Sequence, residues 1–355
     1  MMAFFKSICF SVAIAAIIIL SLSVVNGSKR KADQDTDIAN QPAQKKPRLV
    51  DSCISDNDTT VPPSPKNGDG VQTIMQSVSL QDFDAYLSEY IGNSTNLALL
   101  LDYDGTLTPI VSHPDLATLP VETKNVLQTL AKMPNVYIAI ISGRGLDDVK
   151  NKVGIDGLTY AGNSGLEILF PNGTNYVHPL PNEYREKVTE LLKCLQDRVC
   201  KHGAWVENKG TILTFHYRKV PEDLRAKLVS EAQRFIEVAG LKVMEAHCAL
   251  EAKPYVDWNK GKAALHILDK AFGRDWRKKH IRIIFVGDDV VDEDAMKALK
   301  GTAVTFRVDA SNIVETSAEH RLPDIDSVLN MLKWVARHCD KRELREDSVE
   351  NLSDG

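Results

Sequence analysis

The chain has 355 residues, more than a single domain of typical size contains, so we expect at least two folded units. Apolar residues make up 43% of the sequence and charged residues 26%, which excludes a mainly disordered, collagen-like or wholly membrane-embedded chain. The formal net charge is −5, whereas proteins that neutralise many phosphates of a nucleic acid are usually strongly basic, so we expect no nucleic acid as a main partner.

The N-terminal segment, residues 1–27, contains a long apolar stretch. Residues 7–25 carry no charge, which is typical of a secretory signal peptide, and the stretch is also long enough to cross a bilayer as a membrane anchor. Lys29, Arg30 and Lys31 follow it, and basic residues there favour a cytoplasmic location for the part of the chain that comes after. The segment therefore predicts either a cleaved signal peptide or an uncleaved anchor. A start at a downstream methionine would instead make the protein cytoplasmic.

Two segments have the composition of disordered chain. Residues 28–75 are rich in charged, Ser, Pro and Gly residues and too poor in apolar ones to form a core, so we expect a disordered linker. We also expect a disordered tail at residues 341–355.

Between these segments the hydrophobic pattern alternates between strands and helices. Short, continuous apolar runs are typical of strands buried in a parallel sheet, and they occur at residues 96–101, 136–141 and 281–286. Helical spacing occurs at residues 121–133, 261–271 and 293–300, and a further strand is expected at 303–308. This alternation predicts an α/β fold with a doubly wound parallel sheet.

Each of the three apolar runs ends in a polar motif. These motifs are Asp102-Tyr-Asp104-Gly-Thr106, Ser142-Gly-Arg144 and Gly287-Asp288-Asp289-Val-Val-Asp292. Because ligands of such sheets bind at the carboxyl ends of the strands, we expect the three motifs to form one site.

The first motif suggests a metal and a phosphate. Asp102 and Asp104 would each raise the pKa of the other unless a cation lay between them. Mg²⁺ fits such oxygen ligands, with Asp288 and Asp292 as further acidic groups, and Thr106 can hold a phosphate oxygen. Taken alone, the motif also fits an acidic loop or a calcium turn. Ser142 alone would be a helix cap, and Lys260 alone a solvated lysine at a helix start.

The stretch from residue 165 to 255 is too long for one crossover and predicts an inserted domain. Its strands show the alternation of an antiparallel sheet with one packed face and one solvent face. The expected packed face holds Leu213, Phe215, Tyr217, Met244, Ala246, Cys248 and Leu250. The expected solvent face holds Thr214, His216, Arg218, Glu245, His247, Glu251 and Lys253. That second face is either a plain solvated surface or a face that binds a polyol.

The ordered set of motifs resembles the haloacid dehalogenase (HAD) superfamily and, within it, the trehalose-6-phosphate phosphatases, over residues 90–335. The segments that carry the resemblance are LDYDGTLTPI (101–110), ISGR (141–144), YAGNSGLE (160–167), VENK (206–209), LEAKP (250–254), NKG (259–261) and VGDDVVDE (286–293). It implies a HAD-like catalytic core, residues 76–165 and 255–340, with an inserted α+β cap, residues 166–254, that determines substrate specificity.

The resemblance also implies a role for each core residue. Asp102 would be the nucleophile that forms an aspartyl-phosphate. Asp104 would be the general acid for the leaving sugar oxygen and then the base that activates water. Ser142 and Lys260 would hold the phosphoryl oxygens. The implied magnesium ligands are Asp102, the backbone carbonyl of Asp104, Asp288 and Asp292.

Substrate contacts are implied as well, at Thr106, Gly143, Arg144, Asn163, Glu207, Lys209 and Glu251. Glu207, Lys209 and Glu251 match positions that grip the second glucose. The sequence departs from the family pattern at Ser164, where the family usually has histidine, and at Lys253, where arginine is common. Lysine keeps the charge but loses the bidentate fork.

The implied activity is hydrolysis of trehalose 6-phosphate to trehalose and phosphate, the last step of trehalose biosynthesis, with a trehalose-phosphate synthase as a partner. The alternatives are a phosphatase for another sugar phosphate, such as sucrose phosphate, and a non-catalytic regulator that binds a sugar phosphate. The substrate is expected in the cytosol, and an uncleaved anchor with the catalytic domain facing the cytosol would reconcile it with the N-terminus.

Overall fold

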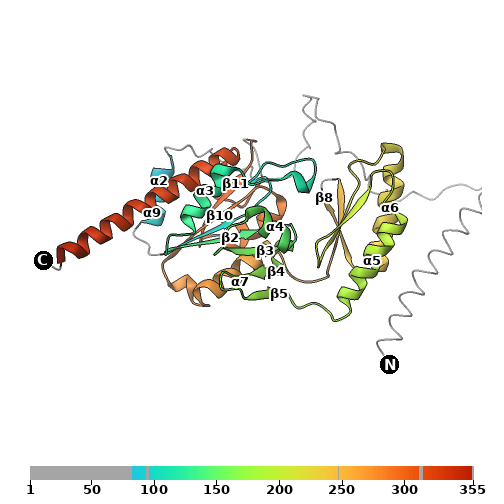
Figure 1. Ribbon diagram of the computed structural model, residues 1–355, viewed down its shortest axis with the longest axis horizontal. Helices are drawn as coiled ribbons and strands as arrows, with labels where there is room; N and C mark the ends of the chain where they lie inside the picture. The colour runs from blue at the N-terminus through green and yellow to red at the C-terminus, as the bar shows by residue number, and fades with distance from the viewer. Residues whose placement is uncertain (1–81, 93–95, 247, 312–314, 354–355) are drawn as a thin grey trace, which may run out of the picture. The chain divides into compact units, whose positions relative to one another are not determined.

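The computed structural model describes residues 82–92, 96–246, 248–311 and 315–353 (Figure 1). The signal peptide or anchor expected at residues 1–27 and the linker expected at 28–75 lie outside these residues and stay predictions. The described chain divides into two compact units. The core unit comprises residues 82–180, 209–211 and 256–353, and the inserted unit comprises Pro181–Asn208 and Ile212–Tyr255.

The core unit is built on an eight-stranded sheet with the strand order β12-β11-β10-β1-β2-β3-β4-β5. The strands are β1 (Asn96–Leu101), β2 (Val136–Ile141), β3 (Thr159–Gly162), β4 (Glu167–Leu169), β5 (Asn175–Val177), β10 (Ile281–Gly287), β11 (Val304–Val308) and β12 (His320–Leu322). The pairs from β12 to β3 are parallel, whereas β4 and β5 add antiparallel strands at one edge. This arrangement confirms the predicted fold class.

The sheet is apolar on both faces. Along β1, Leu97, Leu99 and Leu101 enter one core cluster, whereas Ala98 and Leu100 enter the other. The first cluster is completed by α2 (Asp82–Ile91), α3 (Val121–Leu130), α4 (Leu146–Val153) and α9 (Ile325–Ser353), and the second by α7 (Lys260–Phe272) and α8 (Glu293–Leu299) (Figure 1). Burial on both faces explains why the strands are continuous apolar runs.

Two helix ends differ from the expected positions by more than one residue. Helix α3 ends at Leu130 rather than at residue 133, because Pro134 disfavours helical backbone in the residue before it. Helix α9 runs to Ser353 and so includes most of the segment for which we expected a disordered tail. Its first half is anchored by apolar side chains such as Val328 and Met331, and helix formation propagates readily from an anchored turn.

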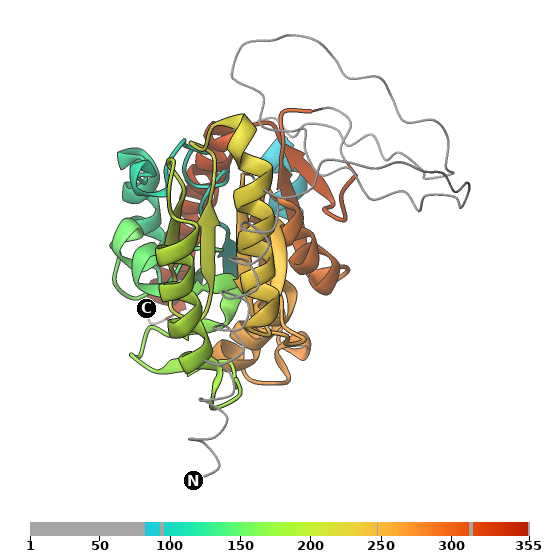
Figure 2. The ribbon, with the colours of Figure 1, turned by 90° about the vertical axis from the view of Figure 1, so that its right-hand side faces the viewer.

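The inserted unit has a four-stranded antiparallel sheet, ordered β6-β7-β9-β8. Its strands are β6 (Trp205–Asn208), β7 (Leu213–His216), β8 (Lys242–Ala246) and β9 (Ala249–Lys253). Helices α5 (Tyr184–Arg198) and α6 (Glu222–Val238) lie side by side, as Figure 2 shows. The α+β composition predicted for the insertion is therefore confirmed.

The predicted faces of the β8–β9 hairpin were wrong. Met244 pairs with Glu251, and Ala246 pairs with Ala249, so Met244 shares a face with Glu251 and not with Leu250. Only two residues separate Ala246 from its partner Ala249. Alternation continued through this turn therefore assigns the side chains of one strand to the wrong face of the sheet.

The insertion also begins later than expected. Because β4 and β5 extend the core sheet, the core unit continues to Leu180, beyond the predicted boundary at residue 165. Short helical turns complete this unit, at η1 (Pro114–Leu116), η2 (Asn163–Gly165), η3 (Trp276–Lys278) and η4 (Val290–Asp292). Among the helices of the described residues, none combines the length and apolar character needed to cross a membrane.

Candidate active site

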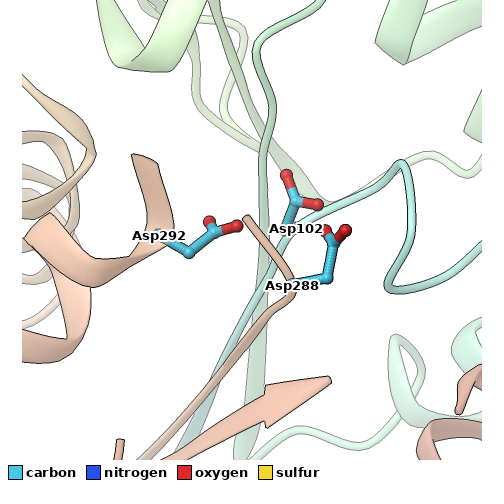
Figure 3. Close-up of side chains that lie close together, drawn as sticks. All are labelled: Asp102, Asp288 and Asp292. Carbon is cyan, nitrogen blue, oxygen red and sulfur yellow. The ribbon is translucent and has the colours of Figure 1, made fainter. Parts of the chain in front are cut away.

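The ends of β1 and β10 bring three carboxylates together. These strands are neighbours, and Asp102 N donates to Val286 O at 2.9 Å. Ligand atoms of Asp102, Asp288 and Asp292 all lie within 4.8 Å of one another (Figure 3). The predicted convergence of the first and third motifs is thus observed.

A short capped turn carries Asp292 into this cluster. Asp289 caps η4, and Asp289 N in turn donates to Asp292 Oδ2 at 3.0 Å, which forms a capping box. Asp292 is fully buried. Any side chain at Gly287 would collide with the Asp292 carboxyl group, so glycine at this position allows the close approach.

Lys260 supplies a positive charge to the cluster. It opens α7 and is 2% exposed, and its Nζ donates to Asp102 Oδ1 at 2.5 Å and to Asp292 Oδ1 at 2.7 Å. Burial alone would lower the pKa of Lys260, but the Asp102 and Asp292 carboxylates more than offset this and raise it. The side chain is therefore a buried ammonium rather than the solvated lysine that was the alternative interpretation.

The acidic cluster has the electrostatics of a cation site. Burial raises the pKa of Asp102 well above its usual range, and the neighbouring Asp292 and Asp288 raise it further against the opposing effect of Lys260. Burial, followed by Asp292 and Asp289, raises the pKa of Asp288 to about 7. Three carboxylates around one ammonium fit a hard divalent cation, which would favour their ionised forms.

Thr106 borders the cluster, whereas Gly143 contacts Lys209. The Thr106 hydroxyl is fully buried and donates to Asp288 Oδ1 at 3.4 Å. Gly143 is exposed, and its carbonyl accepts a hydrogen bond from Lys209 Nζ at 3.4 Å.

Arg144 forms a bidentate ion pair with Asp104. Its Nε donates to Asp104 Oδ2 at 2.7 Å and its Nη2 to Asp104 Oδ1 at 2.8 Å. Nη1 donates to Asp148 at 2.7 Å, and Nη2 also donates to the Pro114 carbonyl at 3.0 Å. The backbone N–H of Arg144 donates to Ser142 Oγ at 3.2 Å. Most of the donors of the guanidinium are therefore directed at protein groups.

Asn163 binds residues 209–211, which belong to the same unit as Asn163. Its Nδ2 donates to the Lys209 carbonyl at 2.7 Å and to Thr211 Oγ1 at 2.9 Å. Thr211 Oγ1 donates to Glu167 Oε1 at 2.8 Å. Thr211 and Glu167 were not predicted as site residues. Glu167 is the last residue of one of the segments that carry the family resemblance. That position was the only sequence feature that pointed to a role for it.

In the inserted unit, Glu207 and Glu251 flank Thr214 across three strands. Glu207 pairs with Thr214 and Thr214 pairs with Glu251, so the three side chains share one face. Glu207 contacts His216 at 2.9 Å, and Glu251 contacts Lys253 at 2.6 Å. The Thr214 hydroxyl is buried and has no hydrogen-bond partner among the described residues. Sequence alternation placed Thr214 on this face but did not select it as a site residue.

Comparison with known proteins finds a matching family model and similar sequences. The family model described as trehalose-phosphatase matches residues 100–325. An uncharacterized glycosyl hydrolase of Mycobacterium tuberculosis (strain CDC 1551 / Oshkosh) is 34% identical over 250 residues, which make up 69% of this chain and 18% of that protein. The probable trehalose-phosphate phosphatase 3 of Oryza sativa subsp. japonica is 32% identical over 258 residues, 68% of this chain and 69% of that protein.

A solved structure is similar as well. The trehalose-6-phosphate phosphatase of Aspergillus fumigatus aligns with a TM-score of 0.53 and 27% identity over 74% of this chain and 99% of that one. The chain spans well under two thirds of the mycobacterial relative, whereas it covers most of the rice protein.

Proposed function

The chain belongs to the trehalose-phosphatase family, and on that premise we propose that it hydrolyses trehalose 6-phosphate to trehalose and phosphate. The observation that carries the proposal is the buried Asp102 carboxylate, bound to Lys260 and adjacent to Asp288 and Asp292. A carboxylate that attacks an anionic phosphate needs positive charge around it, and Lys260 together with a divalent cation held by the other carboxylates would supply it.

In the proposed reaction, Asp102 attacks phosphorus and the bond to the sugar oxygen breaks. Asp104 gives a proton to the departing sugar oxygen and later takes one from the water that hydrolyses the aspartyl-phosphate. Lys260 and Ser142 hold the phosphoryl oxygens throughout. Dividing hydrolysis into two displacements replaces one difficult step with two easier ones.

The acidic residues fit Mg²⁺, and we propose Asp102, Asp288, Asp292 and the backbone carbonyl of Asp104 as its ligands. When bound there, Mg²⁺ would neutralise charge on the phosphoryl group. The carboxylates with raised pKa values support this proposal, because a cation would relieve the repulsion between them.

Sugar recognition is assigned to the inserted unit. We propose Glu207 and Glu251 of this unit as acceptors for sugar hydroxyls, and Lys209 of the core unit as a further substrate contact. Thr214 supports this proposal, because a buried hydroxyl without a partner is uncommon and a polyol would supply one. A trehalose-phosphate synthase would provide the substrate, and we propose such an enzyme as a functional partner.

Phosphate release by the purified full-length protein tests the proposal. We expect release from trehalose 6-phosphate in the presence of Mg²⁺, loss of release on chelation with EDTA and recovery on adding Mg²⁺ back. Asp102→Asn should abolish turnover, whereas Asp147→Asn, an exposed change of the same type on α4, should leave it unchanged. Near-normal turnover by Asp102→Asn would show that Asp102 is not the nucleophile.

A panel of substrates tests the choice of sugar. Turnover of glucose 6-phosphate or sucrose phosphate equal to that of trehalose 6-phosphate would indicate a broader sugar phosphatase. Binding of trehalose 6-phosphate without turnover under any metal condition would indicate a regulator.

A further inference from the structure

Two strained residues follow β3. Asn163 and Ser164 have φ angles of 52° and 57°, in the left-handed region, which side chains other than glycine adopt rarely and serine more rarely than asparagine. Two backbone hydrogen bonds hold them there, from Asn163 N to Arg144 O at 2.7 Å and from Ser164 N to Ser142 O at 2.8 Å. Such strain persists only where the surroundings enforce it, and it is frequent at functional sites. The turn is therefore tied to the loop that carries Ser142.

This strained turn directs the Asn163 side chain at the chain between β6 and β7. Asn163 is 1% exposed, and its amide holds the Lys209 carbonyl and the Thr211 hydroxyl. Thr211 is held in turn by Glu167. Residues 209–211 belong to the core unit, although the strands on both sides of them belong to the inserted unit. We call Asn163, Glu167 and Thr211 the turn latch.

Lys209 lies beside the loop that follows Ser142. Its Cα would lie 3.5 Å from a Cβ at Gly145, so the turn packs closely on the loop that follows Ser142. Its Nζ donates to the Gly143 carbonyl at 3.4 Å. The ammonium group of Lys209 therefore lies next to the loop in which we place phosphoryl binding.

We propose that Asn163 is a positioning residue, which holds residues 209–211 on the core unit and thereby places the Lys209 ammonium beside the Ser142–Gly143 loop. The inference rests on the proposed function, because it assigns the benefit to binding of the sugar phosphate. We expected Asn163 to contact the substrate directly, whereas in this proposal Asn163 affects substrate binding by positioning Lys209. A cation held in place before binding avoids the entropic cost of ordering a lysine side chain when substrate arrives.

A double-mutant cycle tests this dependence. Phosphate release from trehalose 6-phosphate is measured for the wild type, Asn163→Ala, Lys209→Ala and the double variant. Loss of a hydrogen bond worth about 1.4 kcal/mol corresponds to tenfold in affinity, so we expect Asn163→Ala to raise KM about tenfold. In the Lys209→Ala background the same change should raise KM less than about twofold. Equal effects in both backgrounds would overturn the proposal.

Position 211 offers a matched pair of variants. Thr211→Val keeps the shape but removes the hydroxyl, and we expect it to raise KM, whereas Thr211→Ser keeps the hydroxyl and should restore the wild-type KM. Thr129→Val is the control, because its hydroxyl bonds only within α3, to the Asn125 carbonyl at 3.0 Å. It should leave KM unchanged. A rise in KM for Thr129→Val as large as that for Thr211→Val would contradict the latch.

Hydrogen–deuterium exchange gives a readout that does not need turnover. We expect the amides of residues 209–211 to exchange faster in Asn163→Ala than in the wild type, while those of β1 keep their protection. Unchanged exchange at 209–211 would overturn the proposal. A wild-type protein that released no phosphate would contradict the proposed function, and the exchange result would still decide whether the latch exists.

Discussion

Arg144 and Asp104 form a two-pronged ion pair, with Nε to Oδ2 at 2.7 Å and Nη2 to Oδ1 at 2.8 Å. One planar guanidinium thus sets the orientation of the carboxylate to which we assign proton transfer. Tyr103 adds to this arrangement, since the Arg144 guanidinium lies 5.5 Å from the centre of its ring.

Arg144→Lys should therefore impair proton donation by Asp104. Lysine keeps the charge but cannot hold both carboxylate oxygens in a fixed geometry. We expect kcat for trehalose 6-phosphate to fall at least about tenfold, part of the effect of a general acid. Turnover of p-nitrophenyl phosphate should fall less, because its leaving group departs without a proton. Equal losses in the steady-state kinetics of both substrates would contradict a role through Asp104.

Lys260→Met should strongly destabilise the metal-free protein. It leaves the Asp102 and Asp292 carboxylates buried without their ammonium partner, and breaking a buried pair in this way costs about 3–5 kcal/mol. Urea unfolding in EDTA measures the effect. Lys262→Met is the control, because its ion pair with Asp257 is exposed and worth less than about 1 kcal/mol. Similar unfolding midpoints for the two variants would contradict the buried pair.

Gly105→Ala should weaken Mg²⁺ binding. Gly105 has a φ of +79°, and a Cβ there would collide with the Asp288 carboxylate. Gly173 has a φ of +81° with open space around it, so Gly173→Ala carries the same backbone strain, roughly 1–3 kcal/mol, without the collision. Calorimetric titration with Mg²⁺ should therefore show weaker binding for Gly105→Ala alone. Equal affinities in both variants would show that Asp288 is not displaced.

The raised pKa of Asp288, about 7, predicts an effect of pH on stability that bound metal should remove. Without metal, the folded state holds the proton more tightly than the unfolded chain, so the free energy of unfolding should fall as pH rises from the usual value of 3.8 towards 7. Asp288→Asn should reduce this slope. With saturating Mg²⁺ this slope should disappear over the same pH range, because a bound cation keeps the carboxylate ionised in the folded state, as it already is in the unfolded chain. Urea unfolding between pH 5 and 8, in EDTA or in Mg²⁺, gives both slopes.

Glu251→Ala should impair turnover of the disaccharide phosphate selectively. Loss of a hydrogen bond from a charged group to substrate costs about 2–3 kcal/mol, so we expect kcat/KM for trehalose 6-phosphate to fall about 30- to 100-fold. Glu245→Ala is the control, because Glu245 is exposed and pairs with Leu250 on the opposite face of the β8–β9 hairpin. Comparable losses on p-nitrophenyl phosphate would remove Glu251 from sugar recognition.

The sheet and its acidic site could be predicted from the sequence because burial on both faces leaves a plain signal. The runs 96–101 and 136–141 coincide with β1 and β2 to the residue. Since parallel strands end at the same edge, the polar residues after β1 and β10 had to approach one another, and Asp102 and Asp288 do.

Other features depend on contacts between residues far apart in the chain, which no local pattern encodes. Arg144 meets Asp104 across forty residues, and Asn163 meets Thr211 across forty-eight. The face on which Met244 lies depends on the pairing across the β8–β9 turn. The left-handed backbone of Ser164 is held by its hydrogen bond to Ser142. Serine has no intrinsic preference for this conformation, so the sequence did not predict it.

The strand order places β1 and β10 next to each other in the interior of the sheet, while β5 stands at one margin. Both strands that supply carboxylates are thus braced by neighbours on each side. At that margin, β4 and β5 are joined by a tight turn at Asn172-Gly173, whose residues are exposed. A change in the length of this hairpin would therefore leave the neighbours of β1 and β10 in place.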